Sequence, residues 1–389
     1  MMTLTLQGKS YPLKETIGEI KKENSRKAII FLGGVHGNEP SGYTALCQVF
    51  PELQKLEEHL TGDVYFFAGN IRALQEKKRF IDKDLNRIWL HKNINKVKSG
   101  ELNEENATNE WIDFIRLYKR IKAVVDSGQE IYVIDLHTTS APSIPFITIN
   151  DMIKNRNYSQ KFPLPIILGI EEYLSGPLLS YMNEFGHVSM AFEAGQHDAE
   201  ISVKSQVAFI WTALANGGFL TPKEIPNYKD QNEVLASQHN MAGEVFEVRY
   251  RKAIVPEKEF VMKPGYTNFM PINKDETVAH ENGAAIKTHE GGRIFMPLYQ
   301  KEGDDGYFII RRVPGWALGL SKMLRKVQFE ALLAVLPGVH RSKVNPHTLI
   351  VNPRVAKFLT NELFHLLGYR RKVRSGKQLI FSRREITND

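Results

Sequence analysis

The chain has 389 residues, of which 42% are hydrophobic and 24% are charged, an ordinary composition for a globular protein with room for two or three domains. No apolar run approaches the roughly 18 to 20 residues that cross a bilayer, and the N-terminus lacks the pattern of a signal peptide, so we expect a cytoplasmic protein. The single cysteine, Cys47, excludes an internal disulfide framework and a zinc site built from cysteines.

The net charge of +7 is unevenly distributed along the chain. Residues 315–389 contain 14 Lys+Arg and 4 Asp+Glu, which gives this segment a net charge of +10. The preceding 314 residues therefore carry a net charge of −3. The basic character belongs to the C-terminal segment alone.

Short apolar runs alternate with helical periodicity over the first part of the chain. The predicted strands span residues 27–34, 62–70, 130–137, 163–170 and 187–195. The predicted helices span residues 40–56, 107–128 and 201–218, and Pro40 stands near the start of the first, where its missing N–H costs little. Strands that alternate with helices indicate an α/β fold with a mixed sheet flanked by helices, which we place over residues 1–235.

The pattern changes twice after residue 235. Residues 236–314 contain short alternating apolar runs broken by Pro, Gly and Asp, which predict a small β-rich domain. Residues 315–389 predict a basic helical C-terminal extension. Its expected elements are helices over residues 321–336 and 352–368 and a hairpin over residues 370–385, around Ser375 and Gly376.

Polar side chains stand where the predicted strands end. In open α/β sheets, ligands bind outside the carboxyl ends of the strands. In this chain those ends carry, in order, His36 with Glu39, Asn70 with Arg72, His137, and Glu193. The segment RFIDKDLNR, which follows the second of these ends, adds Arg79, Asp84, Asn86 and Arg87. Groups from four separate strand ends are thus suited to one site.

Two imidazoles and a carboxylate, from His36, Glu39 and His137, match a catalytic zinc site that keeps one position for water. The H-x-x-E spacing lets one tight loop supply two ligands, and the glycines between positions 33 and 37 permit backbone angles that other residues resist. The third ligand comes from a distant strand, which fixes the metal to the sheet. We therefore predict Zn²⁺ as the cofactor.

The remaining polar groups match the other needs of amide hydrolysis. Glu193 is the predicted general base and later the acid that protonates the leaving amine. Arg79 is predicted to stabilise the oxyanion. Asn86 and Arg87 are predicted to bind a substrate carboxylate, because a guanidinium group matches a carboxylate in a two-point contact.

Each of these residues, taken alone, has a simpler interpretation. Most H-x-x-E loops bind no metal, and a lone histidine at a strand end, such as His137, is more often structural. The DLNR segment alone fits a capped turn with a surface arginine equally well. A glutamate before a glycine, such as Glu193, is usually just exposed. The combination of four strand ends favours the site.

Four motifs occur in the order and approximate spacing of a known family: GGVHGNE, RFIDKDLNR, IDLHTTS and FEAGQ. By these motifs, residues 25–215 resemble the aspartoacylase/succinylglutamate desuccinylase family of the zinc carboxypeptidase superfamily. The resemblance implies a carboxypeptidase-like α/β domain and a β-rich domain that narrows access to the site. It also implies zinc-dependent hydrolysis of the amide bond of an N-acyl amino acid.

The resemblance also implies roles by motif position. These are His36, Glu39 and His137 as zinc ligands, Glu193 as the base that activates water, Arg79 as the group that polarises the carbonyl, and Asn86 with Arg87 as the carboxylate-binding pair. Asp135, on the same side of its strand as His137, or Asp84 is expected to orient a ligand imidazole; a structural hydrogen bond is the alternative.

Two positions depart from the family pattern. Aspartoacylases hold the acidic side chain of their substrate with an arginine upstream of the catalytic glutamate, whereas here Asn183 stands ten residues before Glu193. We therefore expect less commitment to aspartate-type substrates, unless Lys161, Lys204 or a residue of the β-rich domain substitutes. The family also uses a tyrosine from its β-rich domain; Tyr307 is the candidate for substrate binding, with a strand tyrosine packed in the core as the alternative.

Two other functions stay open at this point. The first is a metallocarboxypeptidase acting on peptides or cell-wall fragments, which an open groove would favour over a covered site. The second is a binding or regulatory protein that uses the basic C-terminal extension. That extension is suited either to docking on nucleic acid or an anionic membrane surface, or to packing on the catalytic domain with its charges in water. A homo-oligomer is compatible with the sequence.

Overall fold

The structure is a computed structural model in which part of the C-terminal extension is left undescribed. The described residues are 2–197, 199–255, 257–300, 303–326, 337–342, 348–352, 367–375 and 378–383. Within them, no helix is both long enough and apolar enough to cross a membrane.

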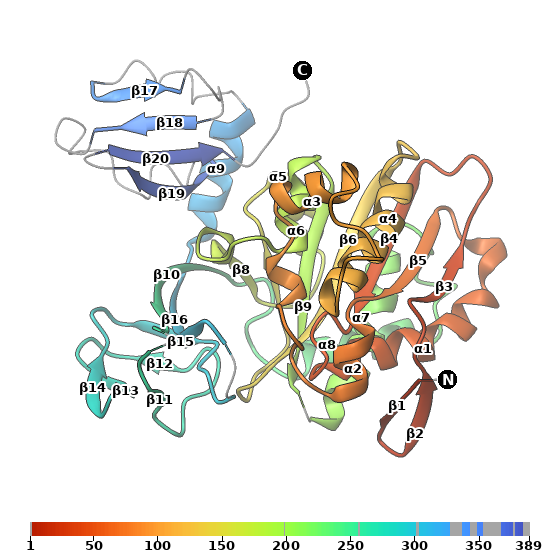
Figure 1. The fold of residues 1–389 in the computed structure, drawn as a ribbon, viewed down its shortest axis with the longest axis horizontal. Helices are drawn as coiled ribbons and strands as arrows, with labels where there is room; N and C mark the ends of the chain where they lie inside the picture. Colours follow the sequence, from red (N-terminus) through yellow and green to blue (C-terminus); the bar gives the residue numbers. More distant parts are fainter. Residues whose placement is uncertain are drawn as a thin grey trace.

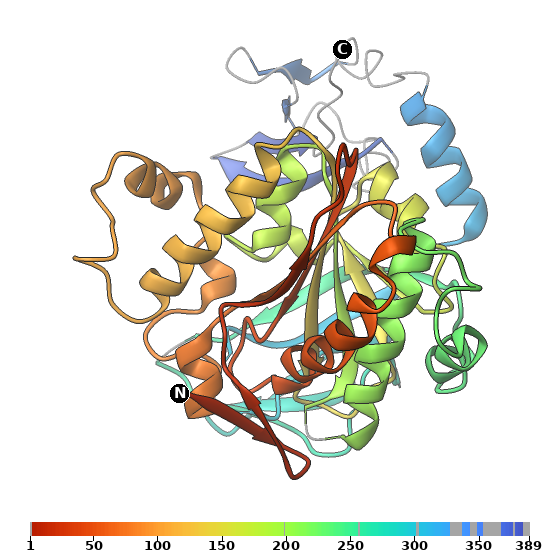
Figure 2. The same ribbon diagram turned by 90° about the vertical axis from the view of Figure 1, so that its right-hand side faces the viewer.

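The central element of the described chain is a mixed sheet of eleven strands with helices on both faces (Figures 1 and 2). In spatial order its strands are β12 (Pro271–Ile272), β15 (Gly292–Phe295), β16 (Asp305–Arg312), β10 (Val245–Ala253), β8 (Ile166–Leu168), β7 (Phe146–Ile149), β9 (Val188–Gln196), β6 (Glu130–Thr139), β4 (Lys27–Gly33), β5 (Asp63–Ala68) and β3 (Thr16–Ile20). Strands β9, β6, β4 and β5 run parallel to one another, so their carboxyl ends lie at one edge. The predicted mixed α/β sheet is confirmed.

Helices connect these strands and cover both faces of the sheet. They are α1 (Pro40–Gln54), α2 (Ile71–Glu76), α3 (His91–Lys98), α4 (Glu110–Val125), α5 (Ile153–Ser159), α6 (Leu178–Glu184), α7 (Glu200–Asn216) and α8 (Tyr228–Ala236), with short 3₁₀ turns η1 (Glu57–His59), η2 (Leu85–Arg87) and η3 (Ile170–Glu172). The predicted helices at 40–56, 107–128 and 201–218 correspond to α1, α4 and α7. Helix α7 ends before Gly218, whose φ of +69° suits the left-handed position after a helix.

Strand β4 shows why its sequence is apolar throughout. Successive side chains point to opposite faces of a strand, so both faces of a central strand need apolar residues. Ile29 and Phe31 pack in one core cluster with residues of α1 and α7. Ile30 and Leu32 pack in a second cluster with residues of α4 and α6. Strand β4, which leads into the H-x-x-E loop, is therefore packed against a hydrophobic core on each of its faces.

The β-rich segment continues the main sheet. Strands β10, β16, β15 and β12 extend it beyond β8, because β10 pairs with β8 in parallel. A separate three-stranded sheet is formed by β11 (Phe260–Met262), β13 (Thr277–Glu281) and β14 (Ala284–Lys287). A hairpin of β1 (Thr3–Leu6) and β2 (Lys9–Pro12) precedes the main sheet. Strand β10, which follows the predicted boundary at residue 236, pairs with β8, which precedes it. The predicted division into domains therefore stays a prediction.

The described part of the C-terminal extension has one helix and a four-stranded antiparallel sheet, which lie together in Figure 1. The elements are α9 (Gly315–Lys326), β17 (Val339–Arg341), β18 (Thr348–Val351), β19 (Tyr369–Ser375) and β20 (Gln378–Arg383). Strands β19 and β20 confirm the pairing of the predicted hairpin. Strands β17 and β18 are additions to the predicted helical extension. Most of the predicted helices at 321–336 and 352–368 lies outside the described residues.

Helix α4 carries a buried carboxyl group, that of Asp113, whose ionisation affects the stability of the fold. Asp113 is 4% exposed, and burial raises the pKa of its carboxyl to about 7. A raised folded-state pKa means that ionising Asp113 opposes folding; the penalty is absent below about pH 4 and complete above about pH 7. We expect the difference between the melting temperature of Asp113→Asn and that of the wild type to increase, in favour of the variant, as pH rises from 5 to 8. A gap that stays constant with pH would contradict this.

Candidate metal and catalytic site

The candidate site lies at the carboxyl edge of the parallel strands. The loop after β4 carries His36 and Glu39, while β6 carries His137 and β9 carries Glu193. His137 and Glu193 are direct partners in the parallel register of β6 and β9. The sheet itself therefore places the third predicted ligand beside the predicted base.

The loop between β4 and α1 needs its glycines for two different reasons. Gly34 has a φ of +70°, in the left-handed region that favours glycine. Gly37 is required by close packing instead, since a Cβ there would lie 2.0 Å from the backbone carbon of Ala73. The expectation that these glycines supply unusual backbone angles is thus met at Gly34, and Gly37 serves to let two backbone segments approach.

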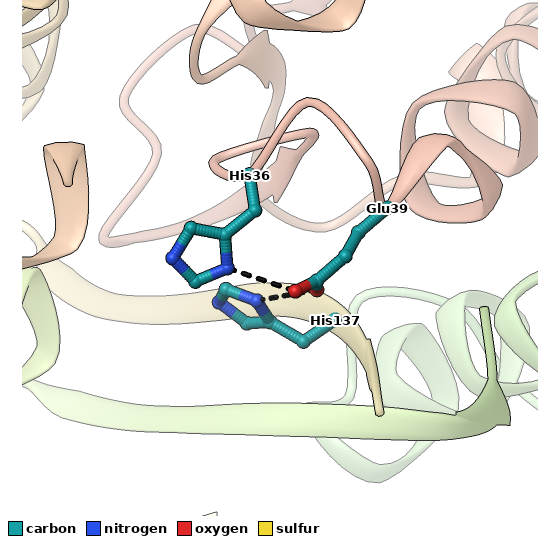
Figure 3. Close-up of side chains that lie close together, drawn as sticks. All are labelled: His36, Glu39 and His137. Atoms are coloured by element: carbon teal, nitrogen blue, oxygen red, sulfur yellow. Dashed lines mark hydrogen bonds and ion pairs between the residues drawn. The ribbon is translucent and has the colours of Figure 1, made fainter. Parts of the chain in front are cut away.

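The predicted ligands His36, Glu39 and His137 converge from two elements, as Figure 3 shows. The Glu39 carboxylate lies between the imidazoles, with Oε1 2.9 Å from His36 Nδ1 and Oε2 3.0 Å from His137 Nδ1. One ligand atom from each residue falls within 4.8 Å of the others, and all three residues are buried. Two imidazole nitrogens and a carboxylate oxygen are donors that suit zinc, so the residues present fit the expected metal.

Each imidazole has a carboxylate on its far side. His36 Nε2 lies 3.1 Å from Asp84 Oδ1, and His137 Nε2 lies 2.7 Å from Asp135 Oδ2. The hydrogen bond between His36 and Asp84 favours the tautomer that leaves Nδ1 available to a metal, whereas Asp135 lies within ion-pair distance of the His137 ring. Both Asp84 and Asp135 thus occupy the orienting position that the sequence suggested for one of them. This arrangement adds to the fit with a metal at the Nδ1 atoms.

Glu193 is buried beside these residues, and its pKa is strongly raised. It is 7% exposed, and its Oε2 has no hydrogen-bond partner among the described residues. Burial raises the pKa of Glu193 to about 8, and the negative charges of Glu39 and Asp135 add to the rise. A carboxyl group that exchanges its proton near neutral pH suits a general base.

Arg79 lies next to both the ligands and the base. Its Nη2 donates to Asp84 Oδ2 at 3.1 Å, and its Nη1 lies 3.6 Å from Glu39 Oε1. Burial of Asp84 alone would raise its pKa, yet the charges of His36 and Arg79 hold that pKa well below the usual range. Asp84 thus stays ionised and joins the arginine to a ligand histidine.

The site residues share one cavity of about 460 Å³. Asn86 and Arg87 line it from η2; the Asn86 Oδ1 accepts from the amide of Leu178 at 3.1 Å, and the Arg87 Nη1 donates to the Asn86 carbonyl at 2.9 Å. Of the predicted site residues, His36, Glu39, Arg79, Asn86, Arg87, His137 and Glu193 therefore meet here.

Tyr307 is not brought to the site. It is fully buried in an apolar cluster of the β-rich segment, with its ring centroid 6.0 Å from that of Tyr250, and it does not line the cavity. The prediction that Tyr307 binds substrate is corrected in favour of a core tyrosine. Its neighbour in strand β16, Phe308, lines the cavity instead, since adjacent side chains on a strand point to opposite faces. Asp305, at the start of β16, also lines the cavity and is separated from Tyr307 by a register shift in the pairing with β10.

Asn183, which stands where the sequence analysis looked for the family's acid-binding arginine, lies away from the cavity. Asn183 is buried in a network of amides, where its Oδ1 accepts from Asn155 at 2.9 Å, and it does not line the cavity. Neither Lys161 nor Lys204 lines the cavity. The lysine and arginine side chains among its described lining residues are Arg79, Lys83 and Arg87.

The β-rich segment contributes Gln300 to the lining of the cavity. The Gln300 Oε1 accepts from Asn38 Nδ2 at 3.1 Å and lies 3.3 Å from His197 Nε2. The other ring nitrogen of His197 lies 2.8 Å from the hydroxyl of Thr138, the neighbour of His137. A polar connection thus joins the ligand loop, the end of β6 and the β-rich segment.

Glu110 is a residue of the site that the sequence analysis missed. Its carboxylate, in the first turn of α4, accepts from the amides of Ile81, Asp82 and Lys83 at 2.6, 3.0 and 3.2 Å and from Asn70 Nδ2 at 3.0 Å. This buried group holds the loop that carries Arg79 and Arg87. An acid in the first turn of a helix is too common a signal to reveal a distant loop as its partner.

The chain is similar to known proteins both in sequence and in fold. Residues 25–204 match the family model described as the succinylglutamate desuccinylase/aspartoacylase catalytic domain. The predicted resemblance to this family is confirmed. A succinylglutamate desuccinylase of Pseudoalteromonas atlantica is 24% identical over 296 residues, 71% of this chain and 78% of that protein. The mouse aspartoacylase is 33% identical over 123 residues, 31% of this chain and 37% of that enzyme.

A solved structure of the family shares the fold. The crystal structure of a succinylglutamate desuccinylase/aspartoacylase from Rhodobacter sphaeroides has a TM-score of 0.52 and 16% sequence identity, and the match covers 75% of this chain and 87% of that one. The chain therefore shares its fold with a protein of the family whose motifs it carries.

The contacts of Glu110 predict a local effect on the loop at residues 79–87. Glu110→Ala removes the acceptor of three amides, and hydrogen bonds to a charged group contribute about 1.5 to 3 kcal/mol each. We expect hydrogen exchange of peptides covering residues 79–87 to accelerate about tenfold or more, since each 1.4 kcal/mol is a factor of ten. Glu104→Ala is the matched control. Glu104 is an exposed acid that precedes α4 and pairs with Arg116 of that helix, away from residues 79–87. Equal exchange in both variants would contradict the role of Glu110.

Proposed function

We propose that the protein is a zinc-dependent amidohydrolase that cleaves an N-acyl amino acid into a carboxylic acid and a free amino acid. The observation that carries the proposal is the meeting of His36, Glu39 and His137 in one cavity with Glu193, on the strand next to His137. The family's relatives are hydrolytic deacylases by name, which supports an enzyme of this type. When bound, zinc supplies Lewis-acid chemistry that acidifies water and polarises a carbonyl.

The residues of the chain account for the proton transfers. Glu193 takes a proton from the water that attacks the amide carbon, and a new C–O bond forms. It then returns a proton to the amide nitrogen as the C–N bond breaks, so that the amino acid leaves with a neutral amine. The raised pKa of Glu193 suits both transfers, because the group must accept and release a proton near neutral pH.

The arginines divide two further tasks. Arg79, 3.6 Å from Glu39, lies where its guanidinium can donate to the oxyanion that develops on the carbonyl oxygen. Arg87, with Asn86, offers a planar donor group to the substrate carboxylate from η2. Asp84 and Glu110 keep these groups in place beforehand, which avoids reorganisation during the reaction.

The cavity favours a small substrate over a peptide. A volume of about 460 Å³ lies in the range typical of small-molecule sites, and Gln300 of the β-rich segment lines the cavity while it accepts a hydrogen bond from Asn38 of the ligand loop. Asn183, ten residues before Glu193, does not line the cavity, so the cavity lacks the family's acid-binding arginine, and a second substrate carboxylate would have to pair with Lys83. A panel of N-acetyl and N-succinyl amino acids, assayed with added zinc, identifies the acyl group and the amino acid.

Removal of the base tests the proposal. We expect Glu193→Ala to reduce hydrolysis by roughly two or more orders of magnitude, as for loss of a general acid/base, while the zinc content measured by mass spectrometry stays at the wild-type level. His239→Ala, a histidine outside the cavity lining, is the control and should leave both quantities unchanged. Wild-type turnover in the Glu193→Ala variant would overturn the assignment.

A further inference from the structure

A buried network of charges joins the C-terminal extension to the catalytic part of the chain. Arg325, in α9, donates from Nη1 to the Asp151 carbonyl at 2.9 Å and from Nη2 to Asp151 Oδ2 at 3.0 Å. The other carboxylate oxygen of Asp151 accepts from Arg156 Nε. Arg156 Nη1 in turn lies 3.2 Å from the Ser321 hydroxyl of α9. Arg325 and Ser321 of α9 thus each contact a charged residue of the catalytic part, Asp151 and Arg156.

This network is an interior feature. Asp151 is fully buried, and Arg325, Arg156 and Ser321 are 4%, 7% and 1% exposed. Gly368, which precedes β19, packs on the guanidinium of Arg325; a Cβ there would lie 3.1 Å from it. Charges removed from water in this way need their partners, because breaking a buried pair leaves an uncompensated charge. Helix α9 is therefore fixed against the catalytic part and is not a loosely attached appendage.

The same network reaches the wall of the cavity. The amide of Asp151 donates to Glu171 Oε1 at 3.2 Å, and both Glu171 and Asn150 line the cavity. On its other side, η3 with Glu171 lies beside strand β19 of the extension. The backbone of Asp151 is thus held by Glu171 through its N–H and by Arg325 through its C=O.

This wall is separate from the reacting groups. Strand β7 runs antiparallel to β9, and Phe146 is the register partner of Glu193. Asn150 follows Phe146 by four residues, which is about 13 Å along an extended chain. The wall near Asn150 and Glu171 therefore faces a part of the substrate distant from the scissile bond. A change there alters substrate binding more than the chemical step.

We propose that Arg325 is a positioning residue for substrate binding, through which the C-terminal extension holds the cavity wall formed by Asn150 and Glu171. The inference rests on the proposed function for its substrate. It assigns a task to a segment that lies outside the matched family model, which ends at residue 204. The extension is thus part of the binding site's support.

The test compares two substitutions of Arg325 in the full-length protein. Arg325→Met removes both hydrogen bonds and the charge, and we expect KM to rise about tenfold, the equivalent of 1.4 kcal/mol, with kcat within about threefold and zinc content unchanged. Arg325→Lys keeps the charge opposite Asp151 but loses the two-point contact, so KM should rise less. Lys322→Ala is the matched control: Lys322 lies on the same helix and contacts Asn157 of α5 at the surface.

Two results would overturn the inference. A lowered melting temperature with wild-type KM in Arg325→Lys would show that the network only stabilises the fold. Hydrogen exchange provides the second measurement, since it needs no substrate: residues 148–172 should exchange faster in Arg325→Lys than in Lys322→Ala, and equal exchange would contradict the inference. Absence of hydrolysis by the wild type would instead contradict the proposed function, and the exchange measurement would still test whether Arg325 holds the wall formed by Asn150 and Glu171.

Discussion

The carboxylate of Glu39, held between the Nδ1 atoms of His36 and His137, is the interaction on which the rest of the site depends. Two imidazoles and a carboxylate buried together are unfavourable without compensation, because buried polar groups need partners. Part of the compensation comes from the carboxylates of Asp84 and Asp135, which lie next to the Nε2 atoms of the two rings. The parallel pairing of β4, β6 and β9 brings these groups to one edge of the sheet. The candidate reacting groups are therefore anchored to the paired strands of the central sheet.

Successive layers support this centre. Arg79 joins Asp84 to the cavity, Glu110 holds the loop that carries Arg79, and α4 anchors Glu110 in the core. On the opposite side of the cavity the support passes from Glu171 to Asp151 and on to Arg325 in the C-terminal extension. Each layer fixes the one inside it by hydrogen bonds to charged groups, which are shorter and stronger than neutral ones. The site is thus preorganised by segments far apart in the sequence.

The strand ends were predictable from the sequence because local patterns determine them. Apolar runs mark β4, β6 and β9. The side chains at or just after the ends of these runs are the predicted metal ligands and the predicted base. Tyr307 was misplaced because alternation along a strand decides which face a residue occupies, and the local sequence did not reveal that β16 points Phe308 to the cavity. Glu110 and Arg325 were missed because their partners lie far away in the chain. The pairing of β10 with β8, which extends the sheet, was likewise not predictable, since the sequence of a strand does not specify which strand it pairs with.

Direct location of the metal tests the account most sharply. Crystals of the zinc-loaded protein, measured on both sides of the zinc absorption edge, should show an anomalous peak coordinated by Nδ1 of His36, Nδ1 of His137 and a carboxylate oxygen of Glu39. Nδ1 is expected in both cases because Asp84 and Asp135 engage the Nε2 atoms. A zinc ion bound elsewhere, with no peak between these three side chains at saturating metal, would contradict the account.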